Sequence, residues 1–116
     1  MFDTFKVIHV YSRANAIEDG TLVDVSPAAK AIGFKVPVAI SATLFETILS
    51  GITPGSSSAV AVINHLLASA ISEIQFSLNA DQIEFQFGMR RTKVICHIGP
   101  GDTPEPVITI MTSADL

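Results

Sequence analysis

Hydrophobic and polar residues alternate through the second half of the chain. Hydrophobic side chains occupy every other position over residues 83–89 and 94–98, and a further apolar run covers residues 107–111. A period of two is typical of β-strands that place one face on a core. Short linkers between these runs, such as Arg90-Arg91-Thr92, favour hairpins. We therefore expect an antiparallel sheet of about four strands, one of them over the alternating residues 74–78.

Residues 58–72 repeat instead with the period of an α-helix. Hydrophobic side chains that include Val60, Ile63 and Leu67 share one face, and small or polar residues share the other. No Asp, Glu, Lys or Arg occurs between Glu46 and Glu73. Because a surface helix normally carries charges on its outer face, we expect this main helix to be largely buried or docked on something.

The first half of the chain carries the start and stop signals of short helices. Ser12, Ser26 and Ser41 are N-cap residues for helices over 13–18, 27–32 and 42–49. Short extended pieces are expected over 7–10, 22–25 and 36–40. The predicted fold class is therefore α+β, with a main helix and shorter helices packed on one face of the sheet.

A single domain is expected over residues 1–116. In this prediction the N-terminal segments 1–55 dock against a helix-plus-sheet unit that covers residues 56–112.

Composition narrows the class of protein. Of 116 residues, 48% are hydrophobic and 16% charged, with a formal charge of −4, which excludes intrinsic disorder. A mean hydropathy of +0.48 fits either an apolar surface covered by a partner or second copy, or a small protein rich in Ala, Ile and Val. The longest unbroken apolar run is residues 59–63, too short for a membrane span. With one cysteine, Cys96, and no visible signal peptide, we expect a reducing compartment, the cytoplasm.

One segment near the N-terminus gathers most of the candidate binding residues. Tyr11, Arg13, Glu18 and Asp19 lie close together in the chain, and Asp24 follows shortly after. These side chains form either a ligand site or a capped turn whose arginine pairs locally.

A second group, Arg90, Arg91 and Lys93, is the only basic cluster, and His97 lies beyond it on the predicted outer face of the sheet. These four residues are candidate surface contacts. The cluster is narrow and the net charge is negative, which argues against direct nucleic-acid binding and favours a charged hairpin tip.

No arrangement of residues indicates catalysis or a cofactor. Cys96 falls on the predicted core face of its strand, where a thiol is neither accessible nor activated. The three histidines lack metal-ligand spacing, and no Gly-x-Ser-x-Gly or phosphate-loop pattern is present. We therefore expect no catalytic residue, metal or cofactor.

Three segments carry a resemblance to a known family. Residues 5–26 read FKVIHVYSRANAIEDGTLVDVS, residues 33–39 read GFKVPVA, and residues 98–111 contain IGPGD and EPVITIM. They resemble a domain of unknown function found in small proteins encoded on plasmids, integrative elements and phages. The chain departs from that family over 53–67, where relatives carry aromatic and charged residues, including tryptophan. The resemblance implies no activity, but it does imply a mobile-DNA setting.

Three functional hypotheses follow. The leading one is a non-enzymatic interaction protein from a mobile genetic element that inhibits a host defence protein, such as a CRISPR effector or restriction enzyme. Its acidic charge suits a nucleic-acid-handling protein partner. The first alternative is a small ligand-binding protein or enzyme that uses Tyr11, Arg13, Asp19 and Asp24. The second is a homo-oligomeric structural module with the charge-poor helix as its interface.

Overall fold

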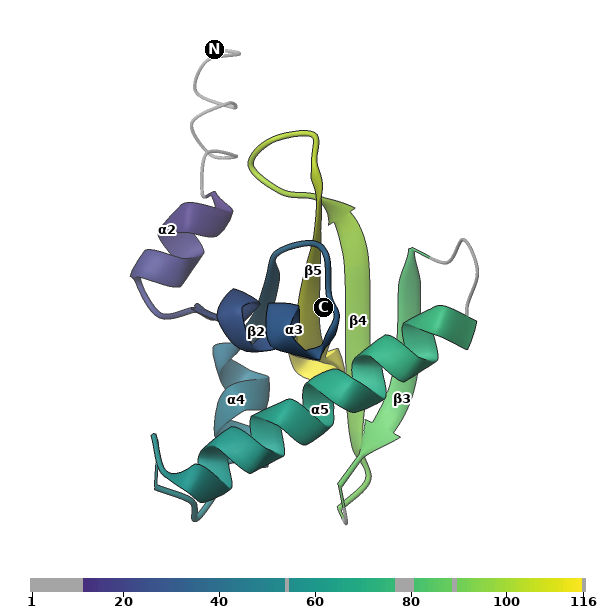
Figure 1. Ribbon diagram of the computed structural model, residues 1–116. Coiled ribbons are helices and arrows are strands. Elements are labelled where there is room, and N and C mark those ends of the chain that lie inside the picture. The colour runs from purple at the N-terminus through teal and green to yellow at the C-terminus, as the bar shows by residue number, and fades with distance from the viewer. Residues whose placement is uncertain (1–11, 54, 77–80, 89, 116) are drawn as a thin grey trace.

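A computed structural model describes residues 12–53, 55–76, 81–88 and 90–115. Within these residues the chain forms a five-stranded sheet, four α-helices and a short 3₁₀-helix (Figure 1). The α+β class is confirmed, and the strand expected over 7–10 lies outside the described residues. The elements are α2 (Arg13–Glu18), β1 (Leu22–Asp24), α3 (Ser26–Ile32), β2 (Val38–Ser41), α4 (Ala42–Ile48), α5 (Ser57–Phe76), β3 (Gln82–Phe87), β4 (Thr92–Pro100), β5 (Pro106–Thr112) and η1 (Ser113–Asp115).

The sheet is mixed, with the strand order β1-β2-β5-β4-β3. All neighbours are antiparallel except β2 and β5, which run parallel with Val38 opposite Ile108. The prediction of about four antiparallel strands was therefore too low in number and wrong for this pair. Alternation identifies a strand and its buried face, but it contains no information about the direction of its neighbour.

Helix α5 runs from Ser57 to Phe76, so the strand predicted over 74–78 is wrong for its first three residues. Ile74 lies three and four positions after Ile71 and Ala70, and all three belong to or pack against the core. This spacing continues one helical face. Because no Gly or Pro interrupts residues 58–76, nothing in the sequence ends the helix where the alternation begins.

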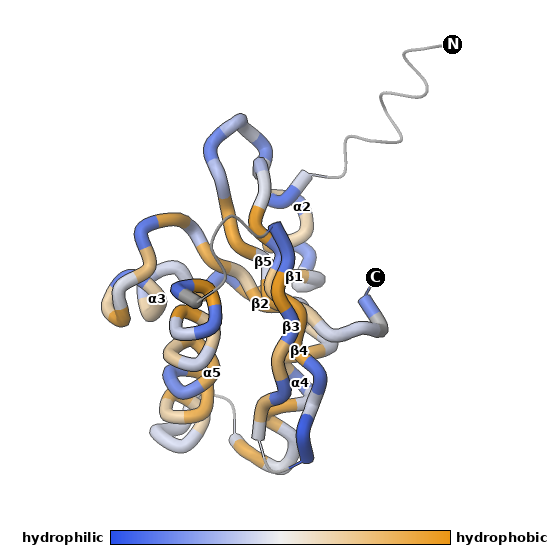
Figure 2. The backbone as a smooth tube through the Cα atoms, turned by 90° about the vertical axis from the view of Figure 1, so that its right-hand side faces the viewer, coloured by the Kyte–Doolittle hydropathy of each residue, from blue (hydrophilic) through white to orange (hydrophobic). Residues whose placement is uncertain are grey.

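The core lies between one face of the sheet and helices α3 and α5 (Figure 2). Leu66 and Leu67 of α5 are fully buried there, as are the strand residues Val94, Cys96 and Ile110. The burial of Cys96 confirms its predicted place on the core face. Residues of the first half share the same core: Val25, Ala29, Phe34, Val38, Ile40 and Leu44. The described part of segment 1–55 therefore supplies two strands and part of the same core.

The opposite face of the sheet carries α2, so the expectation that all helices lie on one face is wrong (Figure 2). Thr109 alternates with the buried Ile108 and Ile110, and its hydroxyl accepts a hydrogen bond from Arg13 of α2. Ile95, which alternates with the buried Val94 and Cys96 and lies on this second face, is nonetheless only 1% exposed. Both faces of the central strands are therefore covered in part.

Helix α5 has a wide exposed face. Val60 was predicted to face the core, yet it is 52% exposed, and its neighbour Ala59 is buried instead. Residues 57–75 are long and apolar enough to span a membrane by length and composition, and 22% of that window is buried. Core helices of soluble proteins share this length and composition, although most of their residues are buried, so length and composition alone do not place α5 in a membrane.

Candidate functional site

Arg13 connects α2 to the sheet. Its Nη1 donates to Thr109 Oγ1 over 2.6 Å and its Nη2 donates to the backbone oxygen of Ile108 over 2.8 Å. Burial lowers the pKa of the guanidinium, while nearby Asp24 and Asp102 act in the opposite direction. An arginine stays charged at neutral pH in such surroundings. The side chain therefore forms charge-assisted hydrogen bonds to two consecutive residues of β5.

The backbone N–H groups in the first turn of α2 are capped by two side chains, one adjacent in the sequence and one distant. Asp102, in the loop between β4 and β5, accepts hydrogen bonds from the backbone N–H groups of Arg13 (2.7 Å) and Ala14 (3.0 Å). Ser12 Oγ accepts from the N–H of Asn15 over 3.0 Å, which confirms its predicted N-cap role. All three N–H groups have partners, and a carboxylate lies at the positive end of the helix.

We call Arg13, Asp102 and Thr109 the α2 clamp. The sequence did not predict that Asp102 caps α2. Asp102 follows Gly99-Pro100-Gly101, and turn geometry alone accounted for these residues. No local signal connects it to a helix almost ninety residues earlier.

Two further carboxylates of the predicted site stabilise local turns. Asp19 Oδ1 accepts from the N–H (2.9 Å) and hydroxyl (2.7 Å) of Thr21. Asp24 Oδ1 accepts from the N–H (3.1 Å) and hydroxyl (2.6 Å) of Ser26. Ser26 is therefore not the N-cap of α3 as predicted. It lies inside the helix, after Val25 at the N-cap, and its Oγ accepts from the N–H of Val38.

Strand register brings several predicted residues to one face. Asp24, Ala39, Thr109, His97 and Gln82 lie opposite one another in a row across all five strands. Arg13 of α2 donates a hydrogen bond to Thr109, the member of this row on β5. His97 is exposed, and its Cε1 lies 3.0 Å from where a Cβ on Gly99 would stand, so its ring lies close to the backbone of Gly99.

The candidate binding residues are thus only partly together. Asp24 lies near enough to Arg13 to raise the pKa of its guanidinium, while Glu18 and Asp19 lie at the end of α2. Tyr11 lies outside the described residues.

Negative charge is concentrated around α2. Five exposed acidic residues and the half-buried Arg13 give a formal charge of −4 there, equal to that of the whole chain, since the other six acidic and six basic residues cancel. A hydrogen bond from Thr103 lowers the pKa of Glu105 in this group. We call the group the acidic end; it consists of Glu18, Asp19, Asp24, Asp102 and Glu105.

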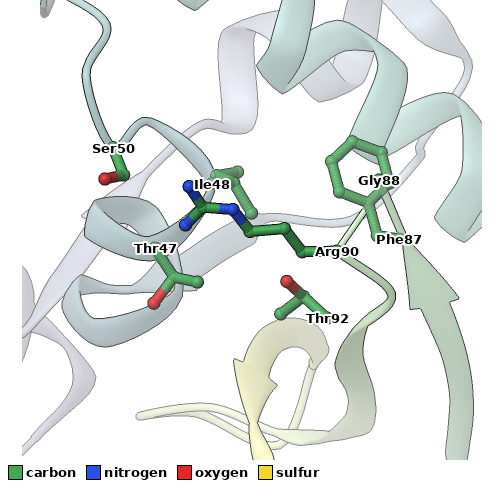
Figure 3. Close-up of a pocket in the computed structure, with 7 residues that line it drawn as sticks. All are labelled: Thr47, Ile48, Ser50, Phe87, Gly88, Arg90 and Thr92. Carbon is green, nitrogen blue, oxygen red and sulfur yellow. The ribbon is translucent and has the colours of Figure 1, made fainter.

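The basic cluster lies on the β3–β4 hairpin beside a shallow groove (Figure 3). One hollow of about 260 Å³ lies between α4 and the hairpin, and the Arg90 side chain extends across it toward Thr47 and Ser50. An adjoining hollow of about 440 Å³ shares these three residues and is also lined by Glu46. Guanidinium and hydroxyl groups suit a small anion, but the Glu46 carboxylate opposes one.

The four predicted surface contacts do not form one patch. Lys93 pairs with Glu84 over 3.1 Å, whereas Arg90 lines the groove. Arg91 occupies the left-handed region at the hairpin tip, with φ of 53°. His97 lies four residues beyond Lys93 on β4, in the row that meets Arg13.

Cys96 has the properties of a structural thiol. Burial, with a smaller contribution from Glu73, raises its pKa to about 12. A thiol with that pKa stays protonated at neutral pH and is a poor nucleophile. Among the described residues, no three or more His, Cys, Asp or Glu side chains are grouped so as to hold a metal.

These features define a small mixed α+β protein with a clamped N-terminal helix and an acidic end. The chain matches DUF6573, a family of unknown function, over residues 1–115, and it belongs to that family. The family resemblance is thereby confirmed, while the mobile-element origin stays a prediction. No curated protein and no solved structure matches the chain.

Proposed function

We propose that this protein is a non-enzymatic interaction protein whose acidic end binds a basic surface on a protein partner. The observation that carries the proposal is the concentration of the chain's whole formal charge around one clamped helix. A surface with one sign of charge steers a partner of opposite sign and sets the orientation of the encounter.

The clamp supports a binding role because it fixes the shape of this surface. A six-residue helix is too short to be stable alone in water. Arg13 holds α2 against β5, and Asp102 holds it against the β4–β5 loop, through four hydrogen bonds of 3.0 Å or less in all. Less order is then lost on binding, which favours affinity.

The same contacts support binding over catalysis. A catalytic carboxylate must reach a substrate, whereas those of Asp19, Asp24 and Asp102 accept hydrogen bonds that stabilise turns and a helix end. The acidic end therefore contributes charge and shape.

We further propose that the partner is a host protein that handles nucleic acid, such as a defence protein. Proteins of this kind carry Lys and Arg surfaces that neutralise phosphates. An acidic protein that covers such a surface would compete with the nucleic acid and inhibit the partner.

A charge-matched pair of variants tests this proposal. Glu18→Gln with Glu105→Gln removes two charges at the acidic end, and Glu46→Gln with Glu73→Gln removes two elsewhere. Wild-type protein and both double variants are immobilised, exposed to host lysate, and the retained proteins are identified by mass spectrometry.

We expect wild type and the Glu46/Glu73 variant to retain the same basic nucleic-acid-handling protein. Retention by the Glu18/Glu105 variant should fall about tenfold at low salt, or about 1.4 kcal/mol, and salt should release the partner. Equal retention by both variants, or no protein above a blank column, would contradict the proposal.

A further inference from the structure

Strand β3 forms an open edge of the sheet. In the described part of the chain β3 pairs with β4 alone, and its six residues are in continuous register from Gln82 opposite His97 to Phe87 opposite Thr92. It contains no Pro, no Lys and no bulge, the features that normally protect an edge. The other edge strand, β1, has only three residues. Strand β3 is therefore the edge that can template pairing with another strand.

We propose that β3 pairs antiparallel with β3 of a second copy, so that Phe85 faces Phe85 of the second copy. Ile83 then lies opposite Phe87, both on the helix-covered face. On the other face Glu84 lies opposite Gln86, whose amide can donate to the carboxylate. The adjacent register of the same orientation places Glu84 opposite Glu84 and is disfavoured by like charge.

Helix α5 extends this interface beyond the strand. In the proposed register the two-fold axis is perpendicular to the sheet, so both copies of α5 lie on the same side of the joined sheet. A hollow of about 500 Å³ between α5 and β3 is lined in part by Ala68, Ser72, Phe85 and Gln86, and therefore borders the seam.

The chemistry of α5 favours a second copy as the occupant of this face. Glu73 is the one charged residue of α5, and it lines this hollow. Because residues 57–72 contain no Asp, Glu, Lys or Arg, two acidic molecules meet less repulsion here than between their acidic ends. Half-buried Phe85 and Phe87 supply apolar area at the seam. The strand spans about 20 Å and the helix about 30 Å, dimensions suited to the roughly 800 Å² that each partner buries in a stable interface.

The mass of the full chain tests the proposal. Light scattering at about 100 µM should give twice 12.3 kDa for wild type. Gln86→Glu creates two like-charge pairs with Glu84 across the seam and should weaken the dimer at least tenfold. It should still fold, because Lys93 faces position 86 within the same sheet. Gln82→Glu is the matched control, with the same charge change on the same strand face opposite Gly88, and should leave the dimer intact.

Cysteine cross-linking tests the register. A mixture of Glu84→Cys and Gln86→Cys proteins should form a disulfide-linked heterodimer under mild oxidation, whereas Glu84→Cys alone should cross-link poorly. Cys96 is buried and should stay unreacted. A monomeric wild type, a Gln86→Glu variant as dimeric as wild type, or ready self-cross-linking of Glu84→Cys would overturn the proposal.

A monomer that gains mass only on phospholipid vesicles would likewise overturn the proposal and assign α5 to a membrane surface. The acidic-end variant Glu18→Gln with Glu105→Gln should keep the dimer. Failure of this inference is therefore distinguishable from failure of the proposed function.

Discussion

Helices α2 and α5 are attached to the same sheet by different physical means. Helix α2 has six residues, of which Ala16 is buried, and it is held by hydrogen bonds to residues 89 and 96 positions away in the chain. Helix α5 has twenty residues and is held by buried apolar side chains such as Leu66 and Leu67. A helix with little area to bury depends on a few directed polar contacts, whereas a long helix depends on packing.

The comparison separates local from global effects. Loss of one clamp contact should release α2 while the core persists, because α2 shares little of that core. Loss of one α5 core residue should destabilise the entire domain. The following predictions test this separation, from the largest expected effect to the smallest.

Leu66→Ala should cause the largest loss. Leu66 is fully buried in the core, so its truncation leaves a cavity and should lower the free energy of unfolding by about 2–5 kcal/mol. Val60→Ala, on the exposed face of the same helix, should change it by less than about 0.5 kcal/mol. Denaturant unfolding measures both. Similar losses would mean that the outer face of α5 is packed as well.

Arg13→Ala should release α2. It removes two charge-assisted hydrogen bonds and should cost about 1–3 kcal/mol locally. Hydrogen exchange should accelerate at the amides of residues 13–18, while those of β4 and β5 stay protected. Arg13→Lys keeps the charge but loses the two-pronged geometry, so it should restore protection only in part. Unchanged exchange in the alanine variant would show that α2 is held by other contacts.

Asp102→Asn tests the cap separately from the arginine. The amide can still accept one hydrogen bond, but it removes the negative charge from the helix N-terminus, at a cost of about 1 kcal/mol. Glu105→Gln changes the charge of the same loop without touching α2 and serves as control. Thermal unfolding and amide hydrogen exchange at residues 13–15 should distinguish the two variants. Equal acceleration of exchange in both would argue against a specific cap by Asp102.

Asp115 should give the smallest effect, visible only in acid. Burial acts to raise its pKa, but hydrogen bonds from Thr112 and Ser41 outweigh this and lower the pKa below 3.8. The stabilising contribution is therefore complete above the unfolded pKa and is lost as the pH falls through the lower folded value.

Because most of the Asp115 side chain is exposed, this contribution should stay below about 1 kcal/mol. Asp115→Asn should flatten the dependence of denaturant midpoint on pH between about 5 and 2. An unchanged slope would exclude Asp115 as its source.

The sequence predicted the parts of the fold that local periodicity encodes. Alternation located β3, β4 and the buried side of Cys96, and an apolar run located β5. Serine signals located the starts of α2 and α4. The parallel partner of β2 was not predictable, because residues 38–40 contain no information about residues 108–110.

The end of α5 and the role of Asp102 were missed for related reasons. Residues 74–76 fit both a strand and a helix period, and only packing of Ile74 decides between them. Arg13 was a candidate from its neighbours in the sequence, but its partners Ile108 and Thr109 are far along the chain. Long-range polar contacts of this kind produce no periodic pattern in the sequence, so they cannot be predicted from it.

The position of β5 has a consequence for how the chain acquires its structure during synthesis. This strand lies between β2 and β4 although it is the last of the five strands to be synthesised. Until residues 106–112 emerge from the ribosome, β2 and β4 lack the strand that joins them, and each keeps one edge unpaired. Such late pairing between segments distant in the chain is slow and open to misassociation.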